Sequence, residues 1–527
     1  MKTGKNTGYL FRWVALLVLA VAVCIVFAAY RKDRIEWEKQ MKLADSKVVL
    51  YEGPESLKDA TEEDLKNTSE KNRKQDLMHC TDTRITVNDR ECFVYDTNVN
   101  LTRQWVADYY PPLSRTPIAY FDFEGTVKVE VTVPERDFET VQVSPLAAGI
   151  QPEVDKEAHR ISFYISRPDT YTVTFDDAPE RAVHIFANPL EQDAPDPADE
   201  NVIYIGPGEW DIDSIMPESG QTIYLAGGAV VHGIINANYA HDITICGRGI
   251  LDGSYYEGWK GTAAFIPLKF DHCSGITIQD IIVLNSCAWV CQAFDSADGV
   301  IDGIKIISAR PNGDGITLQS CQNYQVSNCF VRSWDDSLVV KNYDRNSENV
   351  HFENMQLWTD LAQSMEVGYE TNKGRTEDAY MKDISFRNIT VLQNYHKPVI
   401  SVHNADDAVV EKVLFEGITI ENEQIGSGDG DELPYLIDLA IVSNGNWSST
   451  MERGWIRDVT IRDVTLLKGK EVGSRIKGYD KEHKIENVTI ENLKLFGKTI
   501  ESAEAGNFEV DENTVSGLTF GKGEGKE

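Results

Sequence analysis

The chain has 527 residues, enough for about two or three domains with an ample hydrophobic core. Its 84 aspartates and glutamates outnumber its 51 lysines and arginines, which gives a formal net charge of −33. This acidic excess argues against sequence-independent binding to nucleic acid or to anionic membrane surfaces, which needs basic patches, and it suits a soluble, exported protein.

The N-terminal segment contains an uninterrupted apolar run over residues 13–30. A helix of that length, at ~1.5 Å per residue, can just span a bilayer core. A basic cluster, Arg31-Lys32-Asp33-Arg34, follows at once, and the run ends in a poor cleavage site. We therefore expect residues 1–34 to be an uncleaved transmembrane signal-anchor in preference to a signal peptide, with the catalytic part extracytoplasmic, or secreted if the segment is cleaved.

Two regions of different character follow the anchor. Residues 35–75 are charged and poor in apolar residues, so we expect a helical or disordered stalk. Residues 76–195 carry short runs with period-two alternation, such as Val127–Val133 and Ile161–Ile165, which predict a small antiparallel β-sandwich. In this region Cys80 and Cys92 either form a disulfide or stay free, and the sequence leaves both readings open.

From residue 196 to 515 the chain repeats a short apolar pattern that ends in Asn, Asp or Gly. The shortest spacing between copies is 24 residues, and no helical period competes with it. Each copy is too short to bury its own apolar face, whereas stacked copies share one core. We predict an all-β chain whose main domain is a right-handed parallel β-helix, followed by a polar tail over residues 516–527. Six cysteines of this region alternate with Ile and Val and are interpreted as buried small hydrophobes. Copies of the pattern begin at Ile243, Ile276, Val300, Tyr324, Val350, Ile384, Val413, Val459 and Val488, and the copy at Val300 fits less well.

Three aspartates lie about one rung apart in this repeat. Asp314 lies within Asn312-Gly-Asp-Gly315, and Asp335 and Asp336 follow it by 21 and 22 residues. Strands of neighbouring rungs are ~4.8 Å apart, so Asp336 is expected almost directly over Asp314. Crowded carboxylates push their pKa values apart, which provides the acid and the base that glycosidic bond hydrolysis requires. A single aspartate here is more often a turn residue, so only the joint pattern points to catalysis.

Further side chains near these motifs are candidates for substrate binding. The Asn312 amide could bind a sugar hydroxyl or the attacking water. The Lys341 ammonium could hold a carboxylate ionised or bond a substrate oxygen, and Glu366 adds a fourth acid. Flat aromatic rings serve as platforms for sugars, although rings are also ordinary core filler, and Trp334, beside the aspartates, could point inward instead. The aromatic candidates for substrate contact are Trp289, Trp334 and Tyr369, with Trp259 and Trp358 nearby.

Four motifs follow one another along the chain: Gly247–Gly253, Asn285–Trp289, Asn312–Gly315 and Asp335–Lys341. Their order and spacing resemble those of glycoside hydrolase family 28, the polygalacturonases. The added N-terminal sandwich resembles the related family 49, which includes dextranases and isopullulanase. The resemblance implies a parallel β-helix and inverting hydrolysis of an α-linked polysaccharide, either pectin-type or a dextran-like α-glucan. It also implies that Asp335 is the general acid and that Asp314 and Asp336 activate the attacking water.

Two parts of the family pattern are absent. The Gly-His-Gly of polygalacturonases is replaced by Ala362–Gly368, which contains no histidine, and their Arg-x-Lys has only His396-Lys397-Pro398 near its place. Glu366 would be an awkward neighbour for an anionic sugar and an acceptable hydrogen-bond partner for a neutral one. These departures weigh against a galacturonate substrate.

Two other classes of function stay open. A polysaccharide lyase on the same fold would need a calcium site and a basic residue beside the acids, and a non-catalytic carbohydrate-binding surface protein would need neither. No zinc-ligand spacing and no phosphate-binding loop are present, so we expect no metal and no cofactor. The expected partner is a polysaccharide, nucleic acid is not expected, and the oligomeric state is left open.

Overall fold

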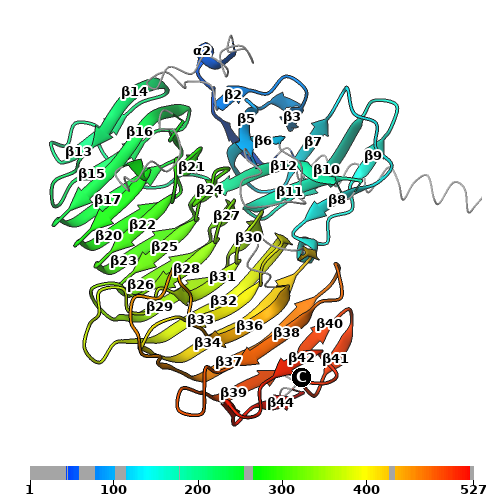
Figure 1. Cartoon of the computed structure of the whole chain (residues 1–527). Helices are drawn as coiled ribbons and strands as arrows, with labels where there is room; N and C mark the ends of the chain where they lie inside the picture. Colours follow the sequence, from blue (N-terminus) through cyan, green and yellow to red (C-terminus); the bar gives the residue numbers. More distant parts are fainter. Residues whose placement is uncertain are drawn as a thin grey trace, which may run out of the picture.

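The computed structural model describes residues 43, 45–58, 77–100, 114–176, 178–254, 265–425 and 434–522, and these are almost entirely β-structure (Figure 1). Two packed sheets, blue and cyan in Figure 1, lie against one side of a long coil of strands that runs from green to red. The predicted signal-anchor, residues 1–34, lies outside the described residues. Within them, no helix is long and apolar enough to cross a membrane.

The N-terminal domain is a pair of sheets whose facing sides share one core. All its strand pairs are antiparallel except β6 with β12, which is parallel. Beside the strands, the described residues include the short helix α2 (Glu55–Lys58) and the 3-10 helix η2 (Leu146–Ala148). The first sheet has the order β2 (Leu77–His79), β5 (Tyr95–Val99), β6 (Ser114–Glu124), β12 (Ala178–Pro189), β11 (Asp169–Phe175) and β8 (Val141–Ser144), with β1 (Lys47–Leu50) beside β6. The second has the order β4 (Arg90–Glu91), β3 (Arg84–Val87), β7 (Val127–Thr132), β10 (Arg160–Ile165) and β9 (Glu153–Asp155).

The first sheet is buried on both faces. One face packs on the second sheet, and the other packs on the coil, where Tyr120 and Phe186 share a cluster with Ile307, Phe330 and Trp358. In β6 eight consecutive residues are buried, so the strand lacks the alternation of a strand with one wet face. The sandwich is therefore fixed to the coil by an apolar interface.

Two segments differ from the sequence-based assignment. Residues 47–50, assigned to the stalk, form β1, which pairs with β6, because Val48 and Leu50 alternate with exposed residues and pack on the sandwich core. Residues 515–521, partly assigned to the polar tail, form β43 and β44, which pair with β39. Cys80 and Cys92 are both buried and free, so the disulfide reading is not realised.

The remaining strands form a parallel β-helix, as predicted; its right-handed sense stays a prediction. In its middle each strand pairs with the strand three positions later, such as β22 with β25 and β25 with β28. All pairs are parallel except β40 with β41. The strands are β13 (Val202–Ile205), β14 (Gly208–Ile215), β15 (Thr222–Leu225), β16 (Ala229–Asn238), β17 (His241–Gly247), β18 (Ile250–Asp252), β19 (Leu268–Asp271), β20 (Ser274–Gln279), β21 (Ile282–Leu284), β22 (Cys291–Phe294), β23 (Ala297–Asp302), β24 (Lys305–Ile307), β25 (Ile316–Gln319), β26 (Gln322–Ser327), β27 (Phe330–Ser333), β28 (Leu338–Lys341), β29 (Ser347–Glu353), β30 (Gln356–Thr359), β31 (Met365–Tyr369), β32 (Tyr380–Tyr395), β33 (Ile400–Asn404), β34 (Val409–Ile420), β35 (Glu423–Gln424), β36 (Tyr435–Ile441), β37 (Trp455–Leu466), β38 (Gly473–Lys477), β39 (Ile485–Glu491), β40 (Leu493–Leu495), β41 (Lys498–Ile500), β42 (Phe508–Val510), β43 (Val515–Ser516) and β44 (Thr519–Gly521).

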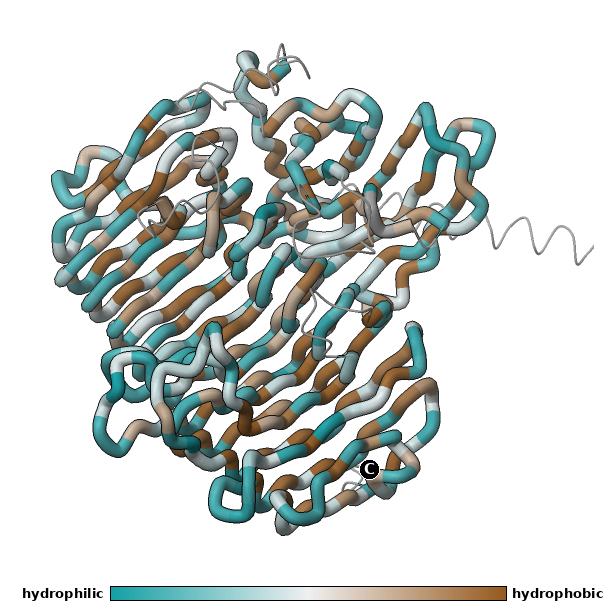
Figure 2. Tube along the Cα trace, viewed as in Figure 1, coloured by the Kyte–Doolittle hydropathy of each residue, from teal (hydrophilic) through white to brown (hydrophobic). Residues whose placement is uncertain are grey.

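The interior of the coil is apolar, and hydrophobic bands along the strands alternate with polar turns in Figure 2. Identical side chains stack between rungs: Phe386 lies between Phe352 and Phe415, with ring centroids 4.9 Å from each. Five of the six coil cysteines are buried and all six are free, which agrees with their interpretation as small core residues. The coil therefore presents a rigid, stacked surface on which outward-facing side chains of successive rungs meet.

Candidate active site

The three predicted aspartates meet at one edge of a single parallel sheet of the coil. We call the strands β22, β25, β28, β31, β33, β36 and β38 the front sheet, because they pair in that order. Ile316 pairs with Leu338, an offset of 22 residues, and the same offset separates Asp314 from Asp336. The Gly315 N–H donates to the Asp336 carbonyl at 2.8 Å, which fixes the two turns together.

Asp314 and Asp336 lie in surroundings that favour their protonated forms. Asp314 is 3% exposed, and burial, followed by the charge of Asp335, raises its pKa well above the usual range. Burial, followed by Asp335, raises the pKa of Asp336 to about 7, and Glu366 adds to this. Lys341 opposes the shift in both carboxyls. This part of the site therefore retains a proton at pH values where an ordinary aspartate is ionised.

Asp335 has a different environment. It is half-buried, and its Oδ2 accepts the Asn312 backbone N–H at 3.2 Å while its Oδ1 accepts the Asp336 N–H at 3.1 Å. Hydrogen bonds from backbone N–H groups favour the ionised carboxylate. Asn312 has a φ of 56°, which asparagine tolerates well, so its backbone N–H can point at Asp335. Neighbouring carboxyls in unlike environments are what acid and base catalysis needs.

Lys341 is held beside Asp314 by a second acid that sequence reasoning missed. Its Nζ lies 4.0 Å from Asp314 Oδ2 and 3.2 Å from Glu370 Oε2, and it lies 5.7 Å from the centroid of the Trp289 ring. Burial opposes the charge of Lys341, but Glu370 and Asp314 raise its pKa above the usual lysine value. Tyr343 donates its hydroxyl hydrogen bond to Glu370 at 3.1 Å. Lys341 is therefore a buried, charged partner of Glu370 and Asp314.

Two predicted substrate contacts are wrong. Glu366 has no exposed surface: the Ser401 hydroxyl donates to it, and His403 Nδ1 lies 2.9 Å from its Oε2. Trp334 is completely buried and packs against Leu361, because the turn that presents the aspartates outward turns this ring inward. Both residues shape the site from beneath and present no surface to a sugar.

The other aromatic candidates divide between surface and core. Trp289 and Tyr369 are half-buried, and the Tyr369 ring stacks on His403 with centroids 4.4 Å apart and planes 12° apart. Trp358 is buried at the interface with the sandwich, and Trp259 lies outside the described residues. Sequence reasoning missed His403, which comes one rung after Glu366 on β33, where Gly368 pairs with it.

Comparison with known proteins gives consistent matches. The model of the family described as Glycosyl hydrolases family 28 matches residues 232–504, just over half of the 527 residues. A probable polygalacturonase of Vitis vinifera is 27% identical over 143 residues, which are 25% of this chain and 29% of that protein's length. Among solved structures, Dex49A from Penicillium minioluteum shares 12% identity and a TM-score of 0.57, over 84% of this chain and 94% of that one. A hyperthermoactive exopolygalacturonase from Thermotoga maritima shares 13% identity over 61% of this chain and 84% of that one, with a TM-score of 0.43.

Proposed function

Because the chain belongs to glycosyl hydrolases family 28, we propose that it hydrolyses an α-linked polysaccharide, pectin-type or dextran-like, with inversion at the anomeric carbon. The observation that carries this proposal is the trio of aspartates on two neighbouring rungs. Asp335 accepts two backbone N–H groups, whereas the pKa values of Asp314 and Asp336 are raised. Such a cluster holds a transferable proton and an ionised carboxylate at the same pH.

The reaction that this arrangement supports is a single displacement. One carboxyl gives its proton to the glycosidic oxygen as the bond to the anomeric carbon breaks, and another takes a proton from the water that forms the new bond from the opposite face. An inverting enzyme separates these groups by about 6.5–9.5 Å so that the water fits. By the family resemblance, Asp335 is the acid, and Asp314 and Asp336 activate the water.

A second assignment exchanges the roles within the pair. The pKa of Asp336 is raised to about 7, chiefly by burial, and the two N–H groups on Asp335 favour its ionised form. Under this assignment Asp336 is the acid and Asp335 belongs to the base.

Leaving-group dependence separates the two assignments and tests the proposal itself. Each of Asp314→Asn, Asp335→Asn and Asp336→Asn in the full chain should lower polysaccharide hydrolysis by about 10²–10⁴-fold, the usual contribution of a general acid or base. A p-nitrophenyl α-glycoside of the responsive sugar needs no leaving-group protonation, so only the variant that lacks the acid keeps its rate on that substrate. Three variants that all cleave the polysaccharide at the native rate would contradict the proposal, and products that absorb as unsaturated sugars would indicate a lyase.

Export through residues 13–30 is part of the same proposal, because a polymer of this size is met outside the cytoplasm. Fractionation of the native producer tests it: activity in the membrane fraction that carbonate washing does not release supports an uncleaved anchor. Activity confined to the cytoplasm would contradict export.

A further inference from the structure

Four charged side chains of alternating sign continue the site along the front sheet. Glu366 lies on β31, His403 on β33, Asp438 on β36 and Arg475 on β38, and we call this set the charge column. His403 Nδ1 lies 2.9 Å from Glu366 Oε2, and its Nε2 lies 2.9 Å from Asp438 Oδ2. Arg475 donates from Nε and Nη2 to the two oxygens of Asp438, each at 2.8 Å. The column is thus one continuous chain of ion pairs.

The charges of the two cations in the charge column are balanced by its own acids. Glu366, His403 and Asp438 have no exposed surface, and the Arg475 side chain is 19% exposed. Burial opposes the charge of His403, but Glu366 and Asp438 raise its pKa to about 9, so the ring is an imidazolium at neutral pH with both N–H groups donated. The Arg475 guanidinium also lies 4.7 Å from the centroid of the Tyr435 ring.

Beside the aspartates, the charge of a third cation is balanced in the same way. Lys341, the cation nearest to them on the front sheet, already contacts Glu370 and Asp314. Recognition of a uronate carboxylate uses charge-assisted hydrogen bonds from a cation whose charge is not already balanced by the protein. On the front sheet the three cations Lys341, His403 and Arg475 each face an internal carboxylate. A bound uronate would therefore meet cations whose charge the internal acids already balance.

A neutral sugar meets no such cost. Its hydroxyls can form hydrogen bonds with the carboxyl groups of Asp335 and Asp336, which are half-buried. Tyr369 lies flat on His403 and is itself half-buried, so it offers a ring face that is fixed from below by the charge column. Ring faces of this kind pack on the C–H face of a sugar without requiring charge.

We propose that the charge column Glu366–His403–Asp438–Arg475, together with the Lys341–Glu370 pair, makes this a site for neutral α-linked glycans and excludes uronates. This inference rests on the proposed hydrolase function. It separates this chain from an activity on a charged pectin backbone, while leaving the inverting chemistry of the aspartates unchanged.

The test compares substrates that differ in charge. The full chain is incubated with polygalacturonate, with the same polymer fully methyl-esterified, and with dextran, and reducing-end release is followed for each. We expect at least one neutral polymer to be cleaved with a kcat/KM at least tenfold above that on polygalacturonate. Calorimetric titration with short oligosaccharides of each polymer should show the same order in affinity.

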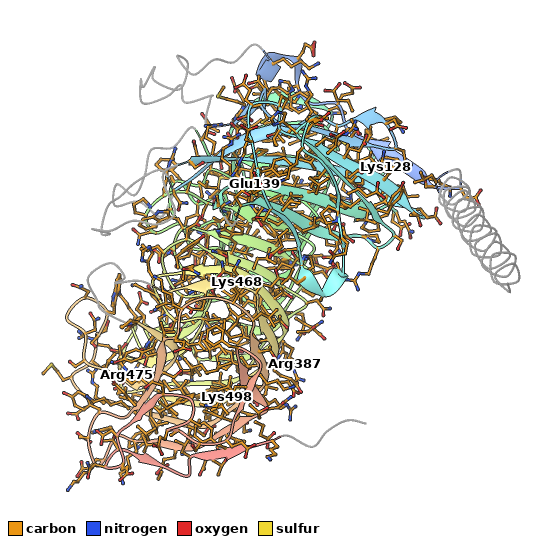
Figure 3. The ribbon with its side chains drawn as sticks, turned by 90° about the vertical axis from the view of Figure 1, so that its right-hand side faces the viewer. Lys128, Glu139, Arg387, Lys468, Arg475 and Lys498 are labelled. Atoms are coloured by element: carbon orange, nitrogen blue, oxygen red, sulfur yellow. The ribbon has the colours of Figure 1, made fainter. Side chains whose placement is uncertain are left out.

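Two variants test the cause of the selectivity. Asp438→Asn frees donors of His403 and Arg475, and Glu370→Gln frees Lys341, so each should raise the affinity for galacturonate oligosaccharides at least tenfold. The matched control is Glu416→Gln: Glu416 also bonds two cations, Arg387 at 2.6 Å and Arg462 at 2.7 Å, so the change in charge is the same. Figure 3 shows Arg387 and Arg475 on different sides of the coil, so this control should leave galacturonate affinity unchanged.

The outcomes separate the inference from the function on which it rests. Cleavage of polygalacturonate at or above the rate on every neutral polymer, with inversion, overturns the inference and leaves the hydrolase proposal standing. No cleavage of any polymer by the native chain overturns both. If a variant does not fold, the native comparison alone decides between these results, because it requires no substitution.

Discussion

The substitution Lys341→Met should shift the acidic limb of the pH profile of kcat/KM toward higher pH. Lys341 is the cation that lowers the pKa of both Asp314 and Asp336, and its Nζ lies 4.0 Å from Asp314 Oδ2. Two unit charges 4 Å apart attract by about 4 kcal/mol at an effective dielectric constant of ~20. Because one pKa unit corresponds to about 1.36 kcal/mol, loss of Lys341 could raise the Asp314 pKa by up to about 3 units.

The sign of the effect on catalysis follows from the role of these carboxyls. If Asp314 and Asp336 must be ionised to activate water, the active form of the variant appears only at higher pH. The loss in kcat/KM should be largest, up to about 10³-fold, below the native limb and should shrink as pH rises. Lys341→Arg, which keeps the charge, should keep the limb within about one unit. A loss of the same size at every pH would refute this reasoning, since it would mean that Lys341 acts only through packing.

Three further predictions concern pH and stability. The native kcat/KM should fall as the pH drops below 7, because burial raises the pKa of Asp336 to about 7 and the carboxylate form that acts as a base is lost below that pH. If kcat/KM declines on the alkaline side instead, Asp336 is the general acid. Arg332→Met should lower the free energy of unfolding by about 3–5 kcal/mol, because it leaves the completely buried Asp360, 3.2 Å from Arg332 Nε, without its cation; a thermal midpoint within about 1 °C of the native value would contradict this. Phe386→Ala should cost about 3–5 kcal/mol by opening a cavity between the two stacked rings, measured by urea unfolding, and Phe386→Leu should cost less.

The repeat made the coil predictable from the sequence. The apolar pattern recurs because each rung must bury the same inward positions, and the registers agree with it: Ile276 pairs with Ile243, and Val350 pairs with Tyr324. The offset of 22 residues between β25 and β28 equals the Asp314-to-Asp336 spacing, because no insertion interrupts that rung. The regular length of this rung was therefore sufficient to predict that Asp314 and Asp336 lie side by side on neighbouring rungs.

Other features of the fold depend on which distant segments pack against each other, and the sequence alone does not show this packing. Strand β6 lacks alternation because both of its faces are covered, one of them by the coil. The charge column was not predictable because the rungs there are longer and unequal: Glu366 pairs with Ser401 at an offset of 35 residues, and Ser401 with Asp438 at 37. When the number of residues between paired positions varies from rung to rung, the sequence does not show which outward side chains lie next to each other. Trp334 shows the same limit, since neighbours in a turn point in opposite directions.

The most direct test of the account is the configuration of the first product. Proton NMR of the reaction of the full chain with its responsive polysaccharide resolves the anomeric signal of the new reducing end before mutarotation scrambles it. The account predicts that the β anomer appears first from the α-linked polymer, and that Asp335→Asn yields no such signal over the same time. Appearance of the α anomer first would contradict it, because retention requires a covalent intermediate and a closer pair of carboxyls.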